Sequence, residues 1–371
     1  LRAGYTQTNN PMMAFGSILN QGAFTPDIDF NDPGQVDNLN LTGTIAYNLY
    51  SGGRVSAHQA AAESRVVASE RDREVTFAQL DTAVVRAYFN IQQTKETVAA
   101  LDAAVTTYEE SLRVAQLRFE SGQLLKSELL NLEVELAQTR EQHLAARQQA
   151  TLAERHFLYL LGQSPAAGSP LALVDDDPAI PALTAPTTVS IEQRPERHAL
   201  DAHREAADAA VNAASSTRRP TINAFASYQL DKGWRLAGDG DSWLAGLQAE
   251  WAIFDGKSST GKIRAARADL AATVAAQRQL ELGLELELER ARLAHTFAAE
   301  QLEVTATLIT QAAEAARISR ERFEAGTLLS AELIAVETRL TSARVRRAVA
   351  TAAERIAVAE LRRAAGLPIL P

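Results

Sequence analysis

The chain has 371 residues, of which 46% are hydrophobic and 22% are charged, and its formal net charge at pH 7 is -9. This length allows two or three globular domains or one elongated fold. A negative charge without a local cluster of lysine and arginine argues against a nucleic-acid partner. The absence of cysteine excludes disulfides and thiolate metal sites, and no apolar run is long enough for a membrane-spanning helix.

The first elements that the sequence predicts are two β-strands. Polar and apolar residues alternate in LNLTGTIAYNLY at 39–50, which is typical of a strand with one apolar face, and AGYTQ at 3–7 is a short candidate strand before it. The stretch between them, residues 9–38, is too long for a tight turn and is expected to be a long loop. We therefore assign residues 1–53 to a first β-hairpin.

Residues 54–163 are predicted to form a long helical hairpin. No glycine or proline interrupts residues 54–121 or 123–161, and these spans are longer than ordinary globular helices. Gly122 can adopt a positive φ, so we expect it to end the first helix and to reverse the chain at a tip near 118–126. A stripe with steps of three and four residues, typical of a coiled-coil seam, comprises Val98, Leu101, Val105, Tyr108, Leu112, Ala115 and Phe119.

A connection and a single helix are expected next. Residues 164–193 are rich in proline, alanine, serine and threonine and are expected to link two halves of the chain. Residues 194–219 are predicted to hold a helix that begins near Pro195. No comparable helix precedes the first strand, so the pattern predicts that a helix is missing before Ala3.

The second half repeats the order of the first. Alternation at 221–230 and 243–254 predicts a second β-hairpin within residues 220–256, with a loop at 231–241. A second long helical hairpin is then expected over residues 257–367, with its tip near 322–330 and a tail at 368–371.

The two expected tips carry nearly the same sequence. RFESGQLLKSELL at 118–130 and RFEAGTLLSAELI at 322–334 both keep Arg-Phe-Glu before a glycine and Leu-Leu after it. The two glycines by themselves are equally explained as ordinary turn residues. A turn does not require the shared neighbours, however, so we expect this surface to be recognised by a partner.

The four strands pose a problem of closure. Four strands cannot close a barrel, and open strand edges leave unpaired backbone groups in a membrane. Three copies would supply twelve strands and a matching tube of helices, whereas the alternative is a half-exposed sheet in a soluble domain. The aromatic residues expected at the membrane interfaces are Tyr47, Tyr50, Tyr228, Trp243, Trp251 and Phe254.

In order and spacing, these features resemble the TolC-type outer-membrane factors, the outer membrane efflux protein family. The resemblance covers nearly the whole chain, and it depends on the motifs together because each one is weak alone. The motifs are Tyr50-Ser51-Gly52-Gly53, Phe254-Asp255-Gly256, Phe119-Glu120-Ser121-Gly122, Phe323-Glu324-Ala325-Gly326, Leu161-Gly162, Ala365-Gly366 and Arg194-Pro195-Glu196.

The resemblance implies a mainly α-helical fold with a transmembrane β part. Long antiparallel coiled-coil helices would form a trimeric α-barrel in the periplasm. Four strands per chain would contribute to a 12-stranded trimeric β-barrel in the outer membrane of a Gram-negative bacterium, with the loop 9–38 at its extracellular mouth.

The resemblance also implies a function and partners. The homotrimer would be the exit duct of a tripartite efflux pump or a type I secretion system. Its partners would be a periplasmic adaptor (membrane fusion) protein, outer-membrane lipid, and an inner-membrane transporter of resistance-nodulation-division, ATP-binding cassette or major facilitator type. The alternative is a non-channel coiled-coil scaffold, an interaction protein with β-hairpin inserts.

Site residues follow from the resemblance position by position. Glu128, Glu332 and Phe323 match the periplasmic entrance, although the glutamates are otherwise read as solvated helix residues and Phe323 as seam packing. The chain departs from the family pattern at Leu328, where a gate arginine can occur, and at Ala335, where a second acidic residue can occur. The expected adaptor-docking tip comprises Phe119, Gly122, Leu124, Leu125, Phe323, Gly326, Leu328 and Leu329.

The sequence does not point to an enzyme. Six histidines are scattered along the expected helices, and no phosphate-binding loop or nucleophile elbow is present. Asp175, Asp176 and Asp177 form an acidic run that is expected to be a solvated loop. We therefore expect no catalytic residue, no cofactor and no metal.

Overall fold

The computed structural model describes the chain apart from residue 30, residues 165–183, residue 188 and residues 370–371. It divides into two compact units. The first comprises Leu1–Val66 and Ala202–Ala275, and the second comprises Val67–Asp201 and Ala276–Pro371.

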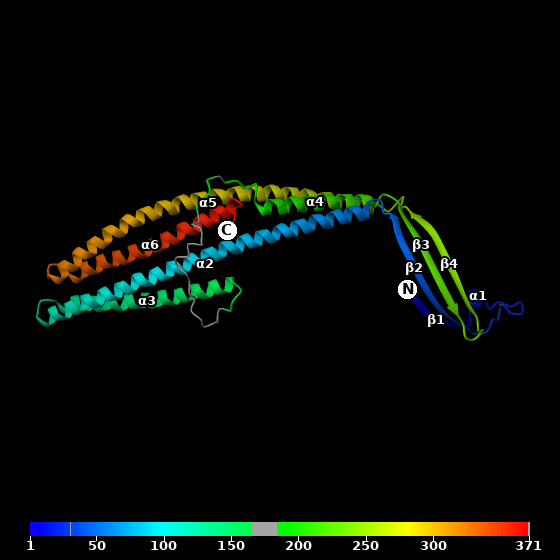
Figure 1. Cartoon of the computed structure of the whole chain (residues 1–371), viewed down its shortest axis with the longest axis horizontal. Helices are drawn as coiled ribbons and strands as arrows, with labels where there is room; N and C mark the ends of the chain where they lie inside the picture. Colours follow the sequence, from blue (N-terminus) through cyan, green and yellow to red (C-terminus); the bar gives the residue numbers. More distant parts are fainter. Residues whose placement is uncertain (30, 165–183, 188, 370–371) are drawn as a thin grey trace. The chain divides into compact units, whose positions relative to one another are not determined.

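The first unit contains one antiparallel sheet of four strands in the order β1-β2-β3-β4 (Figure 1). The strands are β1 (Arg2–Thr8), β2 (Val36–Tyr50), β3 (Thr221–Lys232) and β4 (Asp239–Glu250). The two predicted hairpins are therefore neighbours that pair through β2 and β3. In this sheet β1 and β4 are edge strands, each paired with the chain on one side only.

The strand register confirms the predicted apolar face. Gly43 of β2 lies opposite Tyr228 of β3, which in turn lies opposite Trp243 of β4. Residues that are paired across antiparallel strands point to the same side of a sheet. The apolar sets of three strands therefore share one face, and its large side chains are exposed: Ile45, Tyr47, Tyr228, Trp243 and Leu247.

Both loops of the sheet are shorter than predicted. The expectation of a loop throughout 9–38 is wrong, because helix α1 (Pro11–Asn20) lies within it and β2 begins at Val36. The Asn10 side chain accepts hydrogen bonds from the backbone N–H groups of Met12 and Met13. This cap, followed by proline at the first helical position, is an ordinary helix start. The loop expected at 231–241 is likewise shortened at both ends by β3 and β4.

Strand β4 ends earlier than predicted. Its last residue, Glu250, lies opposite Thr221, the first residue of β3. Pro220 precedes Thr221 and has no N–H group with which to continue the pairing. Trp251 and Phe254, which were predicted to be strand residues, therefore follow the sheet, and the Trp251 indole Nε1 donates to the Arg218 carbonyl at 3.1 Å.

The long helices repeat in length as well as in sequence. Helices α2 (Arg54–Glu120) and α5 (Ser258–Glu324) each have 67 residues, and α3 (Lys126–Leu160) and α6 (Ser330–Ala364) each have 35. Helix α4 (Pro195–Ser216) precedes β3. The mainly helical fold class with four antiparallel strands is confirmed. Among the described residues, no helix combines the length and hydropathy needed to cross a membrane.

A buried arginine joins three helices in the second unit. Arg194, which directly precedes α4, is only 2% exposed. Its guanidinium donates to both carboxylate oxygens of Glu196, to Glu287 of α5 and to the Arg363 carbonyl of α6. The buried charge is therefore paired and hydrogen-bonded, as its low exposure requires.

Candidate functional site

The site that the sequence singles out consists of two tip turns, which connect α2 to α3 and α5 to α6. In the first turn, the Gln123 N–H donates to the Arg118 carbonyl at 2.7 Å and the Gly122 N–H to the Phe119 carbonyl at 2.9 Å. The second turn has the equivalent hydrogen bonds from Thr327 and Gly326. These are Schellman motifs. Because φ is +75° at Gly122 and +80° at Gly326, both glycines end their helices as predicted.

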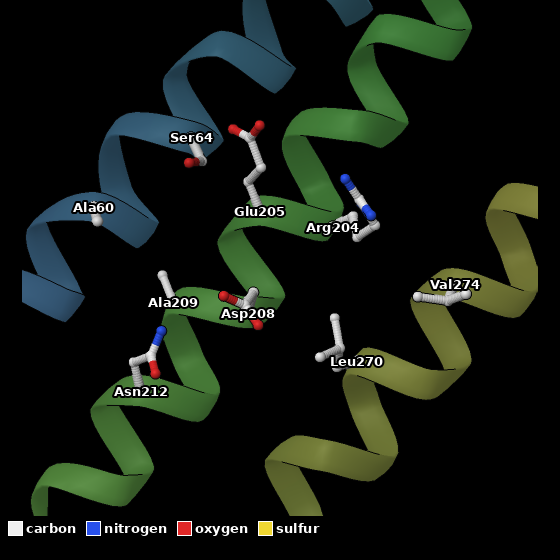
Figure 2. Close-up of a pocket in the computed structure, with 9 residues that line it drawn as sticks. All are labelled: Ala60, Ser64, Arg204, Glu205, Asp208, Ala209, Asn212, Leu270 and Val274. Atoms are coloured by element: carbon white, nitrogen blue, oxygen red, sulfur yellow. The ribbon is translucent and has the colours of Figure 1, made fainter.

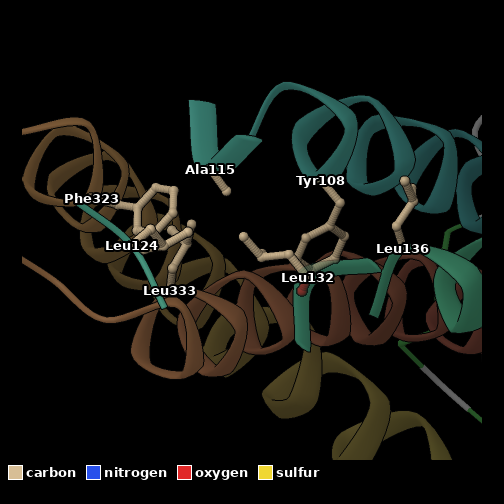
Figure 3. Packing of buried hydrophobic residues seen from close by; sticks show 7 residues of the cluster. All are labelled: Tyr108, Ala115, Leu124, Leu132, Leu136, Phe323 and Leu333. Carbon is tan, nitrogen blue, oxygen red and sulfur yellow. The ribbon is translucent and has the colours of Figure 1, made fainter. Parts of the chain in front are cut away.

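Side chains from four helices form a buried cluster next to these turns (Figure 3). The second half of the predicted stripe, together with residues beyond the glycine, supplies much of the cluster. Leu328 of the second turn is half-buried and packs against the cluster. The members of the cluster are Tyr108, Ala115, Leu124, Leu132, Leu136, Phe323 and Leu333.

Arg118 connects the first tip turn to the second through a hydrogen bond and a cation–π contact. Its Nη1 donates to the Phe323 carbonyl at 3.0 Å, and its guanidinium carbon lies 5.4 Å from the centroid of the Phe323 ring. The same carbonyl accepts the N–H of Gly326 within its own turn. A cation at the C-terminal end of α5 also faces the negative end of the helix dipole, and it lies over an aromatic face. The sequence did not indicate this contact.

A tyrosine adds a second link between the two helical hairpins. The Tyr108 hydroxyl of α2 lies 3.2 Å from the Thr338 hydroxyl of α6 and 3.4 Å from the Ile334 carbonyl. Burial raises the pKa of Tyr108 to about 12, although the hydrogen bond with Thr338 opposes the change. The hydroxyl therefore keeps its proton at neutral pH and can donate to α6.

Helix α6 also buries a carboxylate close to this cluster. Glu337 is 4% exposed, and its Oε1 lies 2.9 Å from Nε of Arg320 on α5. The N–H bond of Arg320 does not point at this oxygen, so Oε1 accepts no hydrogen bond from the residues that the structure describes. Burial raises the pKa of Glu337, and the charges of Arg320 and Arg344 offset the rise only in part.

The expected docking residues fall into two groups. Leu124 and Phe323 are buried and hold the tip together. Leu125 and Leu329 are exposed and occupy the N-cap positions of α3 and α6, where neither provides a capping hydrogen bond. Phe119 was placed on the packed stripe, but it is 39% exposed in the chain.

The two entrance glutamates lie in corresponding places. Glu128 and Glu332 are in the first turns of α3 and α6. There a negative charge faces the positive end of the helix dipole, which gives each a local role. Glu128 is half-buried and Glu332 is exposed. Whether they line an entrance stays a prediction.

The six aromatic residues predicted to lie at membrane interfaces are all in the first unit and all exposed. Tyr47, Tyr228 and Trp243 lie within the sheet. Tyr50 is the last residue of β2 and lies opposite Ile222 beside an irregularity in the pairing.

A hollow of about 540 Å³ opens between α2, α4 and α5 in the first unit (Figure 2). Arg204, Glu205 and Asp208 of α4 line it together with small residues of α2 and apolar residues of α5. Charges of both signs are mixed along one helix face, so the hollow favours no single class of charged ligand.

The structure places no metal site in the part of the chain that it describes: no group of three or more histidines or acidic residues is positioned to hold an ion. The aspartate run at 175–177 lies outside the described residues.

Very long paired helices together with an open four-stranded sheet that exposes an apolar face define the class of fold to which this chain belongs. The model of the outer membrane efflux protein family matches residues 3–163 and 189–367. The chain therefore belongs to the outer membrane efflux protein family. A comparison with curated protein sequences finds no significant match.

Solved structures of outer-membrane proteins, among them the channels CmeC and MtrE, share this fold. VceC of Vibrio cholerae has a TM-score of 0.81 and 18% identity, over 99% of this chain and 86% of that one. CmeC of Campylobacter jejuni has a TM-score of 0.82 and 16% identity, over 98% and 76%. The open state of MtrE from Neisseria gonorrhoeae has a TM-score of 0.77 and 17% identity, over 100% and 80%.

Proposed function

We propose that three copies of this chain form an outer-membrane channel that serves as the exit duct of a tripartite efflux pump or a type I secretion system. The observation that carries the proposal is the open four-stranded sheet, which has two edge strands and an exposed apolar face. Membership of the outer membrane efflux protein family supports it independently.

The physical argument for several copies starts from the sheet edges. Edge strands have unpaired N–H and C=O groups, which cannot remain unpaired in hydrocarbon. Pairing of β4 in one copy with β1 in the next satisfies both edges, and three copies give twelve strands. The apolar face, with Trp243 and Leu247 on it, then faces lipid.

We further propose that the helical hairpins lie in the periplasm and that their tips dock to an adaptor protein. An inner-membrane transporter of resistance-nodulation-division, ATP-binding cassette or major facilitator type supplies the energy. Exposed Leu125 and Leu329 at both tips support docking, because they are apolar side chains at helix starts where polar capping residues are preferred.

The channel is tested with purified protein. We expect the protein to be extracted from outer membranes by detergent only, to have the mass of a trimer by light scattering, and to conduct ions in planar bilayers. A protein that stays monomeric in solution without detergent contradicts the proposal.

Docking is tested with the double substitution Leu125→Asn and Leu329→Asn. Asparagine at an N-cap accepts a backbone N–H and stabilises the helix by about 1 kcal/mol relative to an uncapped start. We therefore expect trimers of unchanged or higher thermal stability that no longer co-purify with the adaptor from the cell envelope. Unimpaired co-purification would remove these leucines from the docking surface.

A further inference from the structure

The internal duplication gives the tips a second arginine and a second phenylalanine that do not contact each other within the chain. Within the chain, Arg118 of the first tip binds Phe323 of the second. The repeated sequence places Arg322 at the position of Arg118, and Phe119 at the position of Phe323. Arg322 lies in the second tip and Phe119 in the first. A contact between an arginine of the second tip and a phenylalanine of the first would therefore repeat the observed contact with the roles of the two tips exchanged.

Both halves are free in the single chain. Phe323 is 1% exposed, whereas Phe119 is 39% exposed. The Arg322 guanidinium is exposed and has no hydrogen bond or ion pair with the residues that the structure describes. Because the backbone turns are the same, the Phe119 carbonyl has the acceptor geometry that the Phe323 carbonyl offers to Arg118.

The surface beside Phe119 is more apolar and more exposed than the equivalent surface beside Phe323. Ile334 and Thr338 of α6, which Tyr108 contacts, correspond by the repeat to Leu130 and Val134 of α3. Leu130 is 46% and Val134 is 56% exposed. The repeat also replaces Tyr108 with Ala312, so the hydroxyl pair of Tyr108 and Thr338 becomes an apolar pair of Ala312 and Val134.

We infer that Arg322 of one copy binds the Phe119 carbonyl and ring of a second copy of this chain, with Ala312 packed towards Val134 of that copy. The inference rests on the proposed trimer and adds to it the residues that join neighbouring copies at the tip. Contacts within chains and between chains then alternate around a ring of six tips, each made by an arginine and a phenylalanine at equivalent positions.

The direct test introduces the photoreactive residue benzoylphenylalanine in place of the exposed Phe119, in otherwise unchanged protein. Irradiation of the purified assembly is expected to give a covalent dimer on a denaturing gel. Mass spectrometry of its digest is expected to find the peptide that contains Arg322. Arg322→Ala in the same labelled chain should reduce the yield, and Arg317→Ala should not, because Arg317 pairs with Glu314 and Glu321 of its own helix.

The outcomes separate the inference from the proposed function. A trimer whose label reacts within its own chain, with a different peptide or not at all, overturns the inference and leaves the channel in place. An unlabelled protein that is monomeric in detergent and bilayers overturns both. In an unlabelled trimer, Arg322→Ala is expected to lower the temperature at which the copies dissociate, with Arg317→Ala unchanged.

Discussion

The turn that ends α6 provides a stability test with a control in the same chain. Gly366 has a φ of +70°, and a Cβ built there would lie 2.9 Å from the carbonyl carbon of Gln193, 3.0 Å from its oxygen and 3.1 Å from N of Arg194. Gly162 is the repeat counterpart at the end of α3. Its φ is +71°, but a Cβ there would have no neighbour within 4 Å.

The expected magnitudes follow from this difference. An alanine at positive φ costs roughly 1–2 kcal/mol, and this cost applies equally to Gly162→Ala and Gly366→Ala. Only the second substitution also presses a methyl group into backbone atoms, and such overpacking costs roughly 1–3 kcal/mol more. We therefore expect the free energy of unfolding to fall by about 1–2 kcal/mol for Gly162→Ala and by about 2–5 kcal/mol for Gly366→Ala.

The measurement is urea unfolding in detergent, followed by the helical circular dichroism signal. The excess loss in Gly366→Ala reports the contact between the end of α6 and the segment that carries Arg194. Equal losses in the two variants would show that this contact is absent or yields without cost, and the reasoning would fail.

Two further predictions use the same kind of matched pair. Because burial raises the folded pKa of Glu337 above its usual value, the protein loses stability as the pH rises from the usual glutamate pKa through the folded pKa. Glu337→Gln should therefore raise the melting temperature at neutral pH and weaken its pH dependence. Glu133→Gln, at the exposed repeat position, should do neither. A lower melting temperature of Glu337→Gln at neutral pH would mean that the ion pair with Arg320 outweighs the cost of burial. On the sheet, Leu247→Arg on the apolar face should reduce the yield of membrane-inserted trimer, because an arginine that faces lipid costs up to about 2–4 kcal/mol at the bilayer centre and less towards the interfaces. Gln248→Arg on the opposite face should not reduce it, and equal yields would contradict the assignment of the lipid-facing side.

The features that the sequence predicted well are those set by local chemistry and periodicity. Alternation identified three of the four strands, because side chains on a strand alternate between two faces. Glycines at 122 and 326 marked the helix ends, because a Schellman turn needs a residue that tolerates positive φ. Two predicted boundaries differ from the structure because a local signal competes with a longer pattern. The cap and proline at 10–11 begin a helix inside a stretch that is too long for a tight turn. The alternation after Glu250 continues in the sequence past the point where Pro220 stops the pairing.

The contacts at the tip could not be read from the sequence in the same way. The two copies of the motif are alike, yet Phe323 is buried and Phe119 is exposed. Nothing in the motif distinguishes the two phenylalanines, since the difference depends on which neighbouring tip is present. The buried pair of Glu337 and Arg320 is equally tertiary, because the two residues lie on different helices and the equivalent first-copy residues are Glu133 and Gln116.

The two repeats of the chain differ in matched pairs, at positions whose counterparts contact each other within the chain. Tyr108 and Thr338 make a polar link, and their counterparts Ala312 and Val134 are both apolar, so the polarity has changed on both sides together. A duplicated surface with no partner would be under no constraint to change in matched pairs, because an exposed position tolerates either polarity. The matched change therefore argues that the second version of this surface is also covered, and it supports the inference that a further copy of the chain covers it.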